Sequence, residues 1–125
     1  MAVRISLLLK KLDTLTYEEF HAYWEGTHAN IFLDCPVIKD KVVKFTQFHF
    51  DRTLSATLAA QGTPILDFDG QVDIYTATFE DLQVLLADPE YQSLVVSDAA
   101  LFSKFSESKI MIGYDKDFIL DGKRV

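Results

Sequence analysis

The spacing of apolar and polar residues along the chain indicates where strands and helices lie. Alternating or continuous apolar residues predict strands over 3–10, 42–51, 71–79 and 108–118. Apolar residues three and four positions apart predict helices over 17–32, 80–87 and 89–105. The resulting order, βαββαβ, is typical of an α+β, ferredoxin-like fold, in which an antiparallel four-stranded sheet carries helices on one face.

Local signals support several of these bounds. Thr16 and Glu19 fit a capping box at the start of the first helix. Gly26 lies inside that helix, where glycine costs about 1 kcal/mol relative to alanine, and marks a bend or a close approach of the backbone. The Cys35-Pro36 pair ends the region, because the residue before proline resists the helical conformation. The connection over 52–70 is long, and its first half favours a helical turn or two.

Apolar residues occupy both faces of the predicted strands. In the strand over 42–51, Phe45, Gln47 and His49 share one face, and Phe48 lies on the other. The helices cover only one face of a sheet of this kind, so the second face needs a partner. A symmetric homodimer that packs sheet on sheet into a joint barrel is the simplest arrangement.

Composition narrows the class of protein. The 125 residues are 49% hydrophobic and 13% aromatic, which predicts a single domain over 1–125 with a substantial core. The net charge of -7 argues against binding to nucleic acid or to an anionic membrane surface. A single cysteine, Cys35, excludes an intrachain disulfide. No apolar run reaches the length of a membrane span, so we expect a cytoplasmic protein.

The stretch that contains the only tryptophan, Trp24, is the best candidate for chemistry. Helical spacing places Trp24, His28 and Phe20 on one inward-looking face. A histidine at the end of an aromatic stripe is either a packed structural residue or a proton-handling group in a sheltered pocket. Periodicity alone leaves both interpretations open.

Other residues could join His28 at a site. His49 either points with His28 into one cavity or lies half in water at the end of its strand. His21 points away from this face and is expected to be exposed. Three histidines without helical pairing predict no metal site. A flat ligand could contact several further side chains, although such aromatic residues more often form plain core: Tyr23, Trp24, Phe45, Gln47, Asp73 and Tyr75.

The chain resembles the EthD-type branch of the dimeric α+β barrel superfamily. In that branch a strand ending in lysine precedes the pattern Leu-Ser/Thr-x-Glu-Glu-Phe-x-x-Tyr-Trp-x-x-x-His. The matching residues here are Lys10-Lys11, the stretch from Leu15 to His28, Phe45 with Gln47, Asp73, and Asp88-Pro89. The resemblance at residue level is strong over 10–49, and the order of elements fits the whole chain.

This resemblance implies a function in aromatic polyketide pathways. Fungal members of the branch include cofactor-free decarboxylases of anthraquinone-type acids such as atrochrysone carboxylic acid. It implies a homodimer without cofactor or metal, with His28 and His49 as catalytic residues and the aromatic and polar set named above around the substrate. Two alternatives stay open: a polyketide cyclase or dehydratase of the same superfamily, and a non-catalytic dimer that binds a small molecule.

Overall fold

An antiparallel sheet of four strands forms the centre of the computed structural model, which describes residues 2–125. The strands are β1 (Val3–Leu9), β2 (Val42–His49), β3 (Gly70–Thr76) and β4 (Lys109–Gly113). They lie in the order β2-β3-β1-β4, with every neighbouring pair antiparallel. This topology confirms the predicted ferredoxin-like α+β fold.

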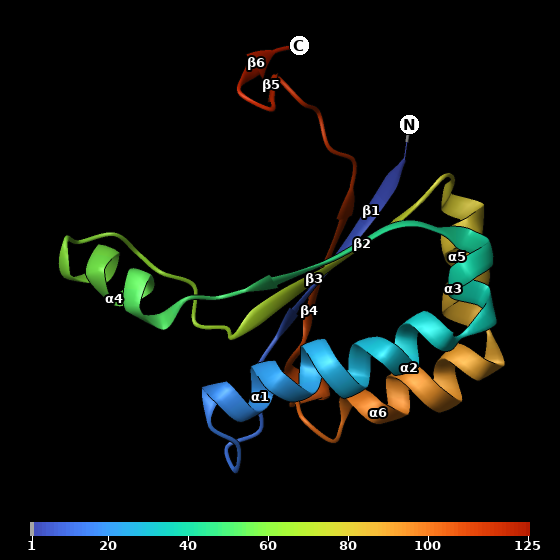
Figure 1. Cartoon of the computed structure of the whole chain (residues 1–125), viewed down its shortest axis with the longest axis horizontal. Coiled ribbons are helices and arrows are strands. Elements are labelled where there is room, and N and C mark those ends of the chain that lie inside the picture. The colour runs from blue at the N-terminus through green and yellow to red at the C-terminus, as the bar shows by residue number, and fades with distance from the viewer. Residues whose placement is uncertain (1) are drawn as a thin grey trace.

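Helices cover one face of this sheet (Figure 1). The first helical run has three parts: α1 (Tyr17–Tyr23), a π-helical turn η1 (Trp24–His28) and α2 (Ala29–Asp34). The run beside it contains a second π-helical segment, η2 (Tyr91–Val96), and α6 (Ser97–Ala99). The shorter helices α3 (Pro36–Lys41) and α5 (Phe79–Ala87) complete the layer. The face of the sheet that these helices leave uncovered is called the open face below.

The predicted capping box begins α1. The backbone N–H of Glu19 donates to Thr16 Oγ1 over 3.1 Å, and the backbone N–H of Thr16 donates to Glu19 Oε1 over 2.9 Å. The helical run continues to Asp34, two residues past the predicted end. Cys35 is then extended, and Pro36 starts the short helix α3, which the sequence pattern did not reveal.

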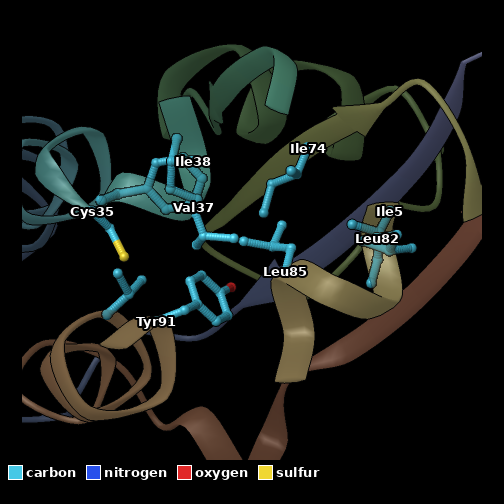
Figure 2. Packing of buried hydrophobic residues seen from close by; sticks show 10 residues of the cluster. Ile5, Cys35, Val37, Ile38, Ile74, Leu82, Leu85 and Tyr91 are labelled. Atoms are coloured by element: carbon cyan, nitrogen blue, oxygen red, sulfur yellow. The ribbon is translucent and has the colours of Figure 1, made fainter. Parts of the chain in front are cut away.

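The larger hydrophobic cluster lies between the sheet and the helices α3, α5 and η2. Figure 2 shows side chains of the sheet, Ile5 and Ile74, close to Leu82 and Leu85 of α5. Val37 and Ile38 approach the same cluster from α3, and Cys35 lies beside it as a buried free thiol. Burial raises the pKa of this thiol, as expected for a packing residue and not for a nucleophile.

A second, smaller cluster surrounds Trp24, whose side chain is only 1% exposed. Phe20 and Phe102 pack on it from the two helical runs, and Leu9 from the sheet. Below the indole, β3 begins with a glycine. A Cβ atom at Gly70 would lie 2.5 Å from Trp24 Cζ3 and 2.7 Å from Trp24 Cη2. The indole therefore occupies space that only glycine leaves free.

We expect Gly70→Ala to lower the free energy of unfolding by about 1–3 kcal/mol, because the added methyl group must displace the buried indole. Denaturant unfolding measures this loss. Gly113→Ala is the matched control, since a Cβ at Gly113 in β4 meets no atom within 4 Å. Equal losses in the two variants would contradict the account of Gly70.

Two segments differ from the predicted elements. The strand expected over 108–118 ends at Gly113, and residues 114–125 leave the body as a C-terminal arm with a small hairpin of β5 (Ile119–Leu120) and β6 (Lys123–Arg124) (Figure 1). The helix expected over 89–105 ends earlier, at Ala99, and a short 3₁₀ turn η3 (Phe105–Glu107) precedes β4. The connection after β2 does form a helix, α4 (Arg52–Ala60), which projects from the body.

Candidate active site

An apolar cavity lies between the sheet and the two helical runs. Its volume is about 50 Å³, room for a few water molecules. Side chains from β1, β2 and β3 line one side, among them Phe45 and Ile74. Trp24 and His28 of η1 line the other side together with residues of η2 and α6. Phe105 of η3 contacts both the cavity and solvent, because it lines the cavity and is 38% exposed.

His28 is the histidine of this cavity, and its imidazole is held by a buried carboxylate. Only 9% of His28 is exposed. His28 Nδ1 lies 2.8 Å from Asp98 Oδ2, and the hydroxyl of Tyr23 donates to Asp98 Oδ1 over 2.8 Å. An ionised carboxylate can only accept, so His28 Nδ1 carries a proton. Among residues 2–125 no hydrogen bond engages His28 Nε2, which leaves this nitrogen for a ligand.

Burial and the Asp98 carboxylate shift the pKa of His28 in opposite directions. Burial lowers the pKa of His28, and the hydrogen bond and charge of Asp98 offset only part of this effect. The free protein therefore holds His28 neutral near pH 7, with a lone pair on Nε2. Asp98 would stabilise the imidazolium when a proton arrives, which is the arrangement of an orienting acid beside a general acid/base.

The π-helical turn η1 brings Trp24 and His28 to the same cavity. The backbone N–H of Ala29 bonds to the carbonyl of Trp24, five residues back, and the turn is wider than an α-helical one. Gly26 lies in this turn, but a Cβ there would meet nothing within 4 Å. Of the two meanings predicted for Gly26, the structure thus shows a local change of helix geometry and no close approach.

Sequence analysis did not identify Asp98. A signal for it exists, because Tyr91, Val95, Asp98 and Phe102 follow helical spacing, and the aspartate is the one charged member of an otherwise apolar stripe. Asp98 is buried in the structure. A buried carboxylate requires partners, and Tyr23 and His28 provide them.

His49 lies beside the first helical run, where it contacts His21 and Trp24, but it does not line the cavity. The indole of Trp24 packs against His49 in a tilted arrangement, with ring centroids 4.5 Å apart, and itself lines the cavity that His49 does not reach. His49 Nδ1 lies 2.6 Å from His21 Nδ1, and His49 Nε2 lies 2.9 Å from Gln47 Oε1. His21 is accordingly half-buried, and the prediction that it is exposed was wrong.

The other candidate residues divide between three places. Trp24 and Phe45 line the cavity, whereas Tyr23 lies outside it and donates to Asp98, which in turn holds His28. Asp73 and Tyr75 lie on the open face, because Val72 and Ile74 take the alternating positions that face the helices. There Asp73 accepts from Ser6 Oγ over 2.5 Å and from the Gln71 amide over 2.9 Å. The structure thus separates these two residues from the cavity.

Within residues 2–125, no group of three histidine, cysteine or acidic side chains is placed to hold a metal ion. No helix in the same range combines the length and apolarity needed to cross a bilayer.

Curated relatives include two fungal decarboxylases. The chain is 29% identical over 102 residues to a decarboxylase of Claviceps purpurea, an alignment that covers 74% of this chain and 72% of the relative. It is 26% identical over 120 residues to decarboxylase nsrE of Aspergillus novofumigatus, covering 89% of this chain and 76% of the relative. At this distance the relatives support a general likeness to decarboxylases.

Solved structures match the fold over nearly the whole chain. An EthD family protein of Bacillus halodurans has a TM-score of 0.65 at 17% identity, with 93% of this chain and 100% of that chain covered. A dimeric protein of unknown function with a ferredoxin-like fold from Bacteroides fragilis has a TM-score of 0.61 at 12% identity, covering 90% and 94%. The EthD domain model itself matches residues 12–106, which is most of the chain and includes Tyr23, His28 and Asp98. The chain therefore belongs to the EthD domain family.

Proposed function

We propose that the protein is a cofactor-free decarboxylase that acts on an aromatic polyketide carboxylic acid. The observation that carries the proposal is the buried His28–Asp98 pair at the wall of an apolar cavity. The fungal decarboxylases among the relatives support the reaction type. The polyketide substrate rests on the family resemblance and on the aromatic side chains at the cavity, Trp24, Phe45 and Phe102.

The reaction needs one proton and no oxidant. An ionised acid next to His28 favours the imidazolium form of this residue, because opposite charges attract strongly in an apolar site. In an acid whose ring system carries a carbonyl β to the carboxylate, the bond between the ring carbon and the carboxylate then breaks, CO₂ leaves, and the bonding electron pair is delocalised onto that carbonyl as an enolate. His28 Nε2 delivers its proton to the carbon of this enolate and returns to the neutral form, so that charge and atoms balance.

The cavity must enlarge to admit a substrate of several rings, since its present volume is about 50 Å³. Phe105 is the lining side chain best placed to move, because it is already partly in solvent and belongs to the short turn η3. Its outward rotation would open the apolar wall opposite the sheet. Closure behind the substrate would exclude water from the enolate.

Incubation of the purified protein with a series of aromatic polyketide acids, followed by mass spectrometry, tests the proposed reaction. We expect a product lighter than the acid by the mass of CO₂. Loss of the mass of water would instead indicate the cyclase or dehydratase alternative. Binding of an acid that is recovered unchanged would indicate a non-catalytic binding protein.

We also propose that the protein is a homodimer in which a second copy covers the open face and the C-terminal arm. The arm starts at the open face, where Asp115 Oδ1 accepts from Arg4 and Asp115 Oδ2 accepts from Tyr75. Beyond it, Phe118 and Ile119 are 69% and 70% exposed. Structural relatives described as dimeric support a second copy as the partner.

Ile119→Asp should weaken this dimer, because a carboxylate would replace an apolar side chain in the proposed contact. Sedimentation over a range of protein concentrations would show the shift toward monomer. Leu101→Asp is the matched control, since Leu101 is 64% exposed but follows α6 on the helical side. Identical association of the two variants would argue against an interface at the arm.

A further inference from the structure

We propose that His21, His49 and Gln47 form a hydrogen-bonded chain that positions the π-helical turn η1, and with it His28, for the reaction. This series of hydrogen bonds lies on the far side of Trp24 from the cavity, and its side chains contact no substrate. Its links are His21 Nδ1 to His49 Nδ1 (2.6 Å), His49 Nε2 to Gln47 Oε1 (2.9 Å) and Gln47 Nε2 to the Trp24 carbonyl oxygen (3.0 Å). The inference rests on the proposed function of His28.

The donor and acceptor of each hydrogen bond in the series follow from its last acceptor, the carbonyl oxygen of Trp24. The carbonyl of Trp24 can only accept, so the Gln47 amide nitrogen donates to it and the Gln47 amide oxygen faces His49. His49 must then donate from Nε2, which leaves a lone pair on Nδ1. His21 donates from Nδ1 to that lone pair. The two imidazoles therefore have opposite tautomers, and each donor in the chain meets an acceptor.

The protonation state of His21 agrees with this assignment of donors and acceptors. Burial lowers the pKa of His21, and the proximity of His49 lowers it further, so the neutral form persists near pH 7. The other charged groups that act on His21 are Glu18 and Glu25 of the same helical run and Arg52 of α4. A proton on each facing Nδ1 would break the link between the two rings.

The Trp24 carbonyl is a critical point of the helix, because η1 begins there. It accepts from the backbone N–H of Ala29 across the wide π turn and also from Gln47. A carbonyl oxygen has two lone pairs, so both bonds can form together. The bond from β2 thereby ties the first residue of η1 to the sheet, and His28 is the last residue of the same turn.

The hydrogen-bonded series also holds the indole of Trp24 in place, through His49. That indole packs against His49 in a tilted arrangement, with 4.5 Å between ring centroids, and also forms part of the cavity wall. His49 is thus held by hydrogen bonds at both ring nitrogens and supports the wall from behind. Gln47 and His49 act through Trp24 and His28, which makes them positioning residues.

Gln47→Glu breaks the last link while keeping the size of the side chain, because a carboxylate cannot donate to the Trp24 carbonyl. We expect kcat to fall about 10- to 100-fold, since a small misplacement of a catalytic group has an effect of this order. KM should change less than about threefold, because the lining side chains remain. Gln47→Met removes the same bond without adding charge and should give the same pattern.

Thr46→Val is the matched control, since Thr46 is the neighbouring residue of β2 and is exposed on the other face. It should leave kcat unchanged. A kcat within about twofold of the parent in both Gln47 variants would overturn the inference, because removing the link should cost at least tenfold. A rise in KM alone would also overturn it and would indicate direct substrate contact.

Nitrogen NMR of the imidazole rings separates this inference from the proposed function. At neutral pH we expect the proton of His49 on Nε2 and that of His21 on Nδ1, with the preference of His49 weakened in Gln47→Met. This result does not depend on any substrate. A His49 proton on Nδ1 would refute the chain even if His28 proves catalytic. Full activity of a His28 variant would refute the proposed function while leaving the chain in place.

Discussion

Replacing His28 with alanine should lower kcat by about 10²- to 10⁴-fold, the range in which a positioned general acid contributes. His28 is the histidine that lines the cavity, and its free Nε2 is the nitrogen able to deliver a proton to the substrate carbon. The protein should stay folded, because Tyr23 still donates a hydrogen bond to the buried Asp98 carboxylate in this variant. Turnover of the acid identified by mass spectrometry, together with circular dichroism, measures both effects.

Asn30→Ala provides the control for this variant, since Asn30 is an exposed polar residue of α2 next to the same turn. It should retain the parent rate. An active His28→Ala protein would remove His28 from the mechanism. The reaction would then need another proton donor at the cavity.

Asp98→Asn should have the second large effect, about 10³- to 10⁴-fold in kcat. The loss compares with that of the equivalent aspartate-to-asparagine change in serine protease triads, where the histidine takes the wrong tautomer. The asparagine amide can donate to His28 Nδ1, which would move the imidazole proton to Nε2 in the neutral form. The variant also loses the negative charge that stabilises the imidazolium.

The pH dependence of kcat/KM gives this prediction a sign. The reaction needs the ionised acid together with a protonated His28. The fraction of free enzyme with His28 protonated decreases as pH rises through the pKa of His28, so kcat/KM should fall over the same range. Burial places that pKa below its usual value, and Asp98 raises it. Removing the charge of Asp98 therefore lowers the pKa of His28, and the falling limb should move to lower pH in Asp98→Asn.

Tyr23→Phe is a graded comparison, because it removes one hydrogen bond to Asp98 and keeps the carboxylate. Its loss of kcat should be smaller than that of Asp98→Asn. If the falling limb has the same position in the parent and in Asp98→Asn, then His28 is not the group whose protonation the profile reports.

The fold was predictable from the sequence because its signals are local. Thr16 and Glu19 form their capping box within four consecutive residues, and the alternation along β2 correctly placed Phe45, Gln47 and His49 on one face of the strand. The predicted ends of the helices and strands were less accurate. The strand expected to reach residue 118 ends at Gly113, since apolar residues in the arm continue the pattern of a strand without any strand beside them to pair with.

The candidate site was predictable only in part, because its key contacts join residues far apart in the chain. His28 and Asp98 are separated by 70 positions, and no local pattern relates them. His49 was a catalytic candidate that would either share a cavity with His28 or lie half in water, and the structure instead packs it against Trp24, outside the cavity. Asp73 and Tyr75 were expected around the substrate. The alternation of β3 instead places both on the open face, where they bond to Ser6 and Asp115.

The buried position of Trp24 makes the unlabelled protein suitable for fluorescence measurements. It is the only tryptophan of the chain, and it lies between the cavity and His49. Indole emission responds to the polarity of its surroundings. The emission of the unlabelled protein should therefore report the arrival of an aromatic ligand at the cavity that Trp24 lines.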